Sequence, residues 1–175
     1  MAEPWDIIVT DIETDGLIEE CTVTHCASII DVVTKEVKAY RPDDIGEYLE
    51  QLKKAKVYIN HNIIGFDFPA LEKLYGFEWN VRSCIDTLVI SRTLYPDRPQ
   101  GHSLKSWGLS LGVLKGDFGE TNDWSKFTED MLQYNIQDCK VTLALFERQM
   151  AQIGWNNEHL LQLVAPNGER WMEVA

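Results

Sequence analysis

The chain has 175 residues, of which 45% are hydrophobic and 10% aromatic, and its formal net charge is −12. This composition is typical of a folded domain with a core of its own and excludes a disordered chain. The strong negative charge argues against broad, nonspecific binding to phosphates. No apolar run approaches the ~20 residues that span a bilayer, and the first residues lack a signal-peptide pattern. We therefore expect one domain over residues 1–175, in the cytoplasm and without membrane contact.

The first third of the chain predicts mostly strands. Trp5–Glu13 is rich in β-branched residues and stops at the turn signal Thr14-Asp15-Gly16. Two further runs, Val23–Val32 and Val37–Tyr40, are joined by a short link and should form a hairpin. A helix is predicted over Ile45–Ala55 from its apolar spacing.

Helices dominate the middle of the chain. Val57–Ile59 reads as a short buried strand. The next segment, Asp67–Tyr75, should be a helix because Pro69 falls in its first turn. Two more helices are predicted over Ile85–Leu94 and Ser103–Leu111.

A long helix near the end gives the clearest pattern. Thr128 is a suitable N-cap, and the acids that follow it suit a first helical turn. One apolar stripe follows, with residues alternately four and three apart: Leu132, Ile136, Cys139, Leu143, Phe146 and Met150. Strands first, then mixed strands and helices, predict an α/β fold whose mixed central sheet is flanked by helices.

Asp11 and Glu13 form an acidic pair at the end of the first strand. Because strand side chains alternate, both carboxylates should point to the same face, with Cα atoms about 6.5 Å apart. Carboxylates that converge from this distance can hold two metal ions about 4 Å apart. Taken alone, an Asp-x-Glu is more simply a strand end that exposes two acids to water.

Two other acids, Asp67 and Asp138, lie at positions that favour a functional site. Asp67 follows a buried strand and its turn, and α/β sheets place their sites at the carboxyl ends of strands. Tyr134 and Asp138 are four apart on the long helix, so they share a face that borders the apolar stripe. Taken alone, Asp67 reads as an N-cap, and the helix pair as a half-buried tyrosine beside an exposed acid.

Together these segments resemble a known family. Asp11-Ile12-Glu13, Asn62–Asp67 and Tyr134-x-x-x-Asp138 are similar, in order and in roles, to the three exonuclease motifs of the DEDD superfamily, and the tyrosine indicates its DEDDy branch. The chain most resembles the proofreading domain of family A DNA polymerases, especially those of phages. The resemblance runs from about Val9 to Gln149, with supporting stretches at Asp67-x-Pro69-Ala70-Leu71, Cys84–Leu88, His102–Leu104 and Trp107-Gly108.

The resemblance implies a ribonuclease-H-like fold and removal of nucleotides from the 3′ end of single-stranded DNA, in phage replication or proofreading and hence in the host cytoplasm. It implies two divalent ions, Mg²⁺ or Mn²⁺, since oxygen ligands suit such hard cations. Their ligands would be Asp11, Glu13, Asp67 and Asp138, and Tyr134 would orient the attacking water. Leu17 would pack against the terminal base, and the last nucleotide would be held by Asn62 and the backbone near Ile12 and Thr14.

Several alternatives stay open from the sequence. Many family members have one residue fewer than the four that separate Asn62 from Asp67 here. No polymerase domain is present, so the chain is either a free-standing exonuclease or part of a split or trimmed polymerase. Its tail, from about residue 155, would dock a polymerase subunit through Trp171 or pack on its own domain. Asp86 is expected to cap or hydrogen-bond rather than bind metal, and His102 is expected near the site.

Two other functions compete with this reading. An RNA-trimming DEDD enzyme remains open, because nothing in the sequence reads a 2′-hydroxyl. A catalytically silent module that binds single strands or a polymerase is disfavoured, because four like charges held together raise each other's pKa unless a cation neutralises them.

Overall fold

A computed structural model describes residues 1–114, 116, 118 and 123–165 of the chain. Its centre is a five-stranded sheet in the order β3-β2-β1-β4-β5. The strands are β1 (Ile7–Thr14), β2 (Thr24–Asp31), β3 (Val37–Tyr40), β4 (Val57–Asn60) and β5 (Cys84–Asp86). β2 pairs antiparallel with β1 and with β3, whereas β4 pairs parallel with β1 and with β5. The predicted mixed sheet and the predicted hairpin are both confirmed.

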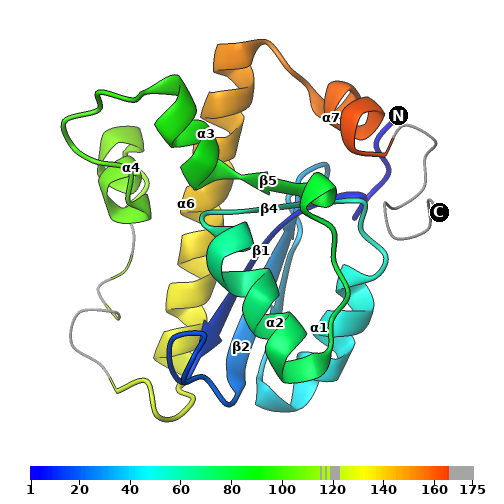
Figure 1. Cartoon of the computed structure of the whole chain (residues 1–175), viewed down its shortest axis with the longest axis vertical. Helices are drawn as coiled ribbons and strands as arrows, with labels where there is room; N and C mark the ends of the chain where they lie inside the picture. Colours follow the sequence, from blue (N-terminus) through cyan, green and yellow to red (C-terminus); the bar gives the residue numbers. More distant parts are fainter. Residues whose placement is uncertain (115, 117, 119–122, 166–175) are drawn as a thin grey trace.

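Helices cover both faces of the sheet (Figure 1). On one face lie α1 (Ile45–Leu52) and α2 (Phe68–Tyr75), and on the other lies α6 (Glu129–Ile153). β1 is therefore apolar on both sides: Ile8 and Ile12 belong to the core under α1 and α2, while Ile7 and Val9 belong to the core under α6. The alternation of β1 thus directs Asp11 and Glu13 towards the face that α6 covers.

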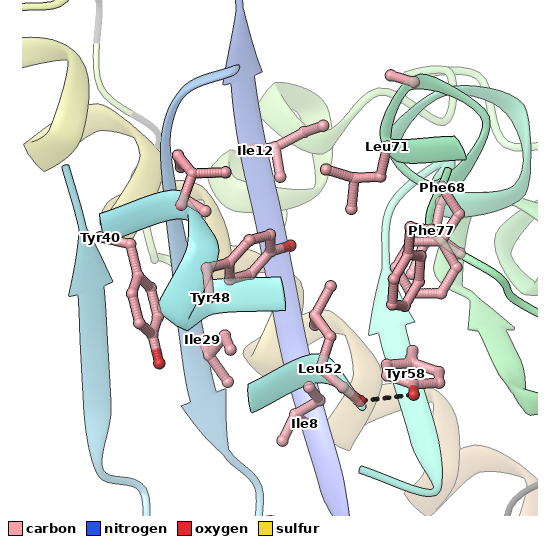
Figure 2. Close-up of a cluster of buried hydrophobic side chains, with 14 of the residues drawn as sticks. Ile8, Ile12, Ile29, Tyr40, Tyr48, Leu52, Tyr58, Phe68, Leu71 and Phe77 are labelled. Atoms are coloured by element: carbon pink, nitrogen blue, oxygen red, sulfur yellow. Dashed lines mark hydrogen bonds between the residues drawn. The ribbon is translucent and has the colours of Figure 1, made fainter. Parts of the chain in front are cut away.

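The core under α1 and α2 is rich in aromatic rings. Figure 2 shows Tyr48 and Leu52 of α1 and Phe68 of α2 lying over the strands. The hydroxyl group of Tyr58, on β4, donates to the carbonyl oxygen of Leu52 at 2.7 Å, so its polar end is satisfied. Burying such rings and aliphatic chains contributes about 1.5–3 kcal/mol each and fixes the sheet against both helices.

The long helix α6 has the predicted N-cap, since the side chain of Thr128 accepts from the backbone N–H of Met131. The helix ends at Gly154, which adopts the left-handed conformation that favours glycine. Its buried face is wider than the predicted stripe. Val141 and Leu145 are also buried, because they pack against α4 (Leu104–Leu111) instead of the sheet. A helix held between a sheet and a second helix buries more than one stripe.

One predicted helix is wrong in its first turn. Ile85 and Asp86 belong to strand β5, and helix α3 begins only at Thr87 and ends at Leu94. The side chain of Asp86 caps this helix by accepting from the N–H groups of Leu88 and Val89, which bears out the expected capping role. A three-residue strand has too little pattern to be read from sequence, and here pairing with β4 decides it. Helix α1 is also shorter than predicted, ending at Leu52.

The remaining elements are short. Three helical turns are η1 (Pro42–Asp44), η2 (Ile63–Asp67) and η3 (Val81–Ser83), and the last described helix is α7 (Asn157–Val164). Leu160 and Val164 of α7 are buried against the sheet, beside the N-terminus (Figure 1). The expected docking role of Trp171 falls outside the described residues. Within the described part of the chain, the helices are all too short or too polar to cross a membrane.

Candidate active site

The five predicted catalytic residues, together with Ile12 and Asn62, line one cavity of about 550 Å³. Its walls include the end of β1, with Asp11 and Glu13, and α6, with Tyr134 and Asp138. They also include Asp67, the last residue of η2. Three segments that are far apart in the sequence therefore place four carboxylates and a phenol around the same space. Glu13, Asp67 and Asp138 are each less than 9% exposed, so the surrounding protein restricts access of water to them.

Three of these acids are close enough to share a cation. Asp11, Glu13 and Asp138 each offer a carboxylate oxygen, and these atoms all lie within 4.8 Å of one another. Asp67 is linked to the group because one amide, that of Asn60, donates to both Asp11 and Asp67. A set made only of carboxylate oxygens matches the preference of Mg²⁺ and Mn²⁺. The donor set thus fits the divalent ions that the resemblance implies.

Two buried asparagines hold the carboxylates, and the sequence reading did not single out either one. The Nδ2 group of Asn60 donates to Asp11 at 2.7 Å and to Asp67 at 2.9 Å. The Nδ2 group of Asn135 donates to the other oxygen of Asp11 at 2.7 Å and to Glu13 at 3.4 Å. Asn135 lies three residues before Asp138 on α6, a spacing that could have placed it on the same face. Asn60 carries no comparable signal.

The cluster creates a strongly negative local field. Burial, and then the negative charge of Asp11, raises the pKa of Asp67 well above its usual value. Burial also raises the pKa of two nearby thiols, Cys26 and Cys139, and the negative charge of Asp11 adds to the rise in both. Both cysteines are therefore held as neutral thiols, and all four cysteines of the chain are free.

The extra residue between Asn62 and Asp67 is absorbed by a π-helical turn, η2. Such one-turn wide helices are common at functional sites. The turn starts at Asn62, whose φ of 73° lies in the left-handed region that asparagine tolerates. Asn62 and Asp67 both line the cavity despite the longer spacing. A Cβ atom on Gly65 would lie only 2.4 Å from Oδ1 of Asn62, so any larger residue there would displace the Asn62 side chain.

Asp86 fixes the same turn from the side. Besides capping α3, its carboxylate accepts from the N–H groups of Asn62, at 2.9 Å, and Ile64, at 3.3 Å. The Asp86 side chain therefore joins the Asn62–Asp67 segment to α3. Its role is structural in this geometry, as expected, since it does not line the cavity.

Residues after β4, on α3 and before α4 also line the cavity, among them His61, Arg92 and His102. The indole N–H of Trp107 donates to Oγ of Ser91, which lies 2.7 Å from Nδ1 of His102. Because Ser91 is fully buried, these contacts hold the His102 ring between α3 and α4.

Leu17 does not line this cavity but borders a second hollow, of about 420 Å³, together with Thr14 and Trp124. Glu13 and Phe66 line both spaces, so the two adjoin. Leu17 is 69% exposed, which leaves an apolar side chain open at the edge of the site. The hydroxyl group of Thr14 donates to the carbonyl of Gly16, and the N–H of Ile12 donates to Asp67. Both groups are thus already engaged.

The ring of Tyr134 packs in a small aromatic group. Its centroid lies 5.8 Å from that of Phe118 and 6.1 Å from that of Trp124. Trp124 is held in turn by a hydrogen bond from Nε2 of His25 to its carbonyl oxygen, at 2.8 Å. These contacts restrict the ring to the wall of the cavity.

Comparison with known proteins places the chain in a family. A scan of protein-family profiles finds no match. The chain is, however, 34% identical to the DNA-directed DNA polymerase of Escherichia phage T7 over 187 aligned positions, which cover 83% of this chain and 27% of that polymerase. The chain belongs to the DEDD family of 3′-5′ exonuclease domains. This DEDD domain is homologous to the exonuclease region of the phage polymerase and spans about a quarter of its length.

Solved structures agree on the fold of the DEDD domain. NrnC of Brucella melitensis with bound Mg²⁺ superposes with a TM-score of 0.60 at 20% identity, covering 90% of this chain and 80% of NrnC. RNase D of Escherichia coli, an exoribonuclease involved in structured RNA processing, gives 0.61 at 17% identity, covering 94% of this chain and 45% of RNase D. At these identities the likeness establishes the ribonuclease-H-like fold expected from the sequence.

Proposed function

We propose that the DEDD domain hydrolyses single-stranded DNA from its 3′ end, one nucleotide at a time. The observation that carries the proposal is the meeting of Asp11, Glu13, Asp67, Tyr134 and Asp138 around one cavity. A binding module would gain nothing from gathering four like charges, because their mutual repulsion opposes folding unless a cation is bound. Homology to a DNA polymerase of a phage favours DNA over RNA as the substrate.

The four carboxylates would hold two divalent cations, Mg²⁺ or Mn²⁺. The close approach of three of them supports this, and so does the bound Mg²⁺ of NrnC. When bound, the two ions would neutralise the acids, acidify the attacking water and stabilise the charge on the leaving oxygen.

Tyr134 would orient the attacking water through its hydroxyl group, which its aromatic neighbours keep near the cavity. The oxygen of this water forms a bond to phosphorus while the bond between phosphorus and the 3′ oxygen breaks. The products are a nucleotide that carries the 5′-phosphate and a strand shortened by one residue that ends in a 3′-hydroxyl.

The terminal nucleotide would be recognised by groups around the same space. Leu17 offers an exposed apolar surface to the last base. Asn62 lines the cavity beside Asp67 and would hydrogen-bond the sugar or phosphate, together with the backbone near Ile12 and Thr14. NrnC, which shares this fold, has been solved bound to pGG, and this supports a short nucleic acid as the ligand.

The test uses a 5′-labelled single-stranded DNA oligonucleotide and an RNA of the same sequence, each with Mg²⁺, with Mn²⁺ and with EDTA. A ladder that shortens from the 3′ end and disappears with EDTA is the expected result for DNA. Asp11→Ala should abolish it, Tyr134→Phe should slow it while metal binding is kept, and Asp43→Ala, at an exposed acid outside the cavity, serves as the matched control.

Each outcome separates the alternatives. Faster shortening of RNA than of DNA would replace the substrate with RNA, in line with the fold shared with RNase D. Full activity of Asp11→Ala would overturn the mechanism. No shortening of either strand would leave a silent binding module as the better reading.

We also propose that the domain acts with a polymerase, because its relative is one and the chain matches 27% of that protein. On a primer–template, proofreading requires faster removal of a mismatched 3′ end than of a paired one, because the paired end must first separate. Equal rates for the two ends would argue for a nuclease that works without a polymerase partner.

A further inference from the structure

Without cations, the carboxylates gathered in this site would repel one another, and two buried amides reduce that repulsion. Asp11, Glu13 and Asp67 repel one another in a medium that screens charge poorly. An asparagine side chain has one NH₂ group with two protons, and here both protons of each group point at two different carboxylates. Asn60 joins Asp11 to Asp67, and Asn135 joins Asp11 to Glu13. Each amide therefore acts as a neutral bridge between like charges.

Asp11 is held from two sides. Its Oδ1 accepts from Asn60 on β4, and its Oδ2 accepts from Asn135 on α6, both at 2.7 Å. Each oxygen of Asp11 thus accepts from one amide. These two bonds fix the plane of the carboxylate from the strand and the helix that carry the amides, before any ion binds.

The orientation of each amide is set by a second contact. Oδ1 of Asn135 accepts from the hydroxyl of Ser28, on β2, at 2.6 Å, and Oδ1 of Asn60 accepts from the hydroxyl of Thr142, on α6, at 3.5 Å. A flipped amide would aim an oxygen at a carboxylate and lose this donor. Both asparagines are at most 1% exposed, so water cannot replace these bonds.

We propose that Asn60 and Asn135 are positioning residues, which hold the carboxylates in the arrangement that binds the two ions. This inference rests on the proposed function of the same site. Neither residue requires contact with substrate, and Asn135 does not line the cavity. Groups that orient metal ligands typically contribute about 10–100-fold to metal affinity or activity.

The first experiment replaces Asn135 with leucine, which has a similar shape and no donor. Mn²⁺ binding to the folded protein is measured by titration calorimetry, and kcat and KM are measured on the labelled DNA. The expected result is a loss of about 10–100-fold in Mn²⁺ affinity and a fall in kcat, with KM for DNA nearly unchanged. Wild-type Mn²⁺ affinity and kcat in a variant that only melts earlier would overturn the proposal, because a residue that merely packs would act on stability alone.

A second variant keeps the test decisive if the leucine protein does not fold. Asn135→Asp keeps the shape and the acceptor for Ser28 but turns a bridge into another negative charge. Its unfolding midpoint in EDTA should fall, because a repelling charge replaces the donor that joined Asp11 to Glu13. Asn80→Asp is the matched control, because that side chain only accepts a hydrogen bond, from Arg82 N–H, which aspartate also can. The same midpoint in EDTA for both aspartate variants would overturn the proposal.

These readouts separate the inference from the proposed function. Calorimetry and unfolding need no turnover, so a wild type that binds Mn²⁺ without cleaving DNA would remove the exonuclease proposal alone. A wild type that cleaves DNA, beside an Asn135→Leu variant with unchanged Mn²⁺ affinity and kcat, would remove the positioning role alone.

Discussion

Replacing Asp86 with alanine tests whether this one carboxylate holds the Asn62–Asp67 turn in place. The side chain accepts from four backbone N–H groups: those of Asn62, Ile64, Leu88 and Val89. It is only 6% exposed, so water cannot take over all four bonds in the variant. Asp86→Ala would leave these donors without an acceptor and would free both the start of α3 and the turn that carries Asn62.

The loss can be worked out from its parts. Removing the cap of α3 costs about 1 kcal/mol. The two bonds to the Asn62–Ile64 turn are charge-assisted, and each is worth roughly 1.5 kcal/mol or somewhat less where the contact is long. The sum is about 2–4 kcal/mol, which for a chain of this size lowers the unfolding midpoint by roughly 4–16 °C.

Thermal unfolding followed by circular dichroism, in the presence of EDTA, measures this change directly. Asp123→Ala is the control, because it removes an equal charge from an exposed turn and should barely move the midpoint. At a temperature where Asp86→Ala is fully folded, KM for DNA should rise, since Asn62 is no longer held. A variant that melts at the wild-type temperature would refute the assigned bonds.

Three further predictions concern the cavity. Burial raises the pKa of Asp67 in the folded protein, so in EDTA the protein loses stability as the pH rises from the unfolded pKa near 3.8 through the folded pKa. Asp67→Asn should remove this loss, and the variant should be the more stable protein in EDTA at about pH 8 but not at about pH 4. Gly65→Ala should cost about 1–3 kcal/mol by displacing Asn62, whereas Gly46→Ala, in an exposed helix with open space around it, should stabilise by up to ~1 kcal/mol, as urea unfolding would show. Saturating Mg²⁺, at about 100 times its Kd, should stabilise the folded wild type by about 2.7 kcal/mol, and Asp11→Ala should abolish the effect.

Periodicity in the sequence predicted much of this geometry. Asp11 and Glu13 share a face because β1 is a strand, and Asp138 meets them because α6 crosses that face. The apolar stripe of α6 was enough to orient it. These inferences succeed because long elements repeat their signal over many residues.

Short elements were predicted wrongly because they are too short to repeat a pattern. β5 has three residues, so Ile85 and Asp86 were read as part of the helix that follows. The π-helical turn before Asp67 is likewise invisible in a periodic pattern, and only the glycine at position 65 hints at it. In both places the backbone follows from pairing or from a close contact made by residues distant in the sequence, which a local window does not contain.

The two amides show another limit. Asn60 ends a strand and Asn135 lies on a helix, and asparagine at either place is unremarkable in a sequence. What distinguishes them is the partner on the second side of each amide, Thr142 for one and Ser28 for the other. These contacts join α6 to the sheet, so they exist only after the tertiary fold has formed.

The net charge of −12 opposes binding to a polyanion, but cations held in the cavity would attract phosphate locally. Four of the acids responsible for that charge are those that would hold cations, so the site would become attractive to phosphate only when it is loaded. Arg92 is the one lysine or arginine among the described residues that line the cavity. Attraction confined to one cavity, on an otherwise repulsive surface, favours a strand end that can enter it over the length of a duplex. The acidic composition therefore supports a nuclease that acts at a terminus.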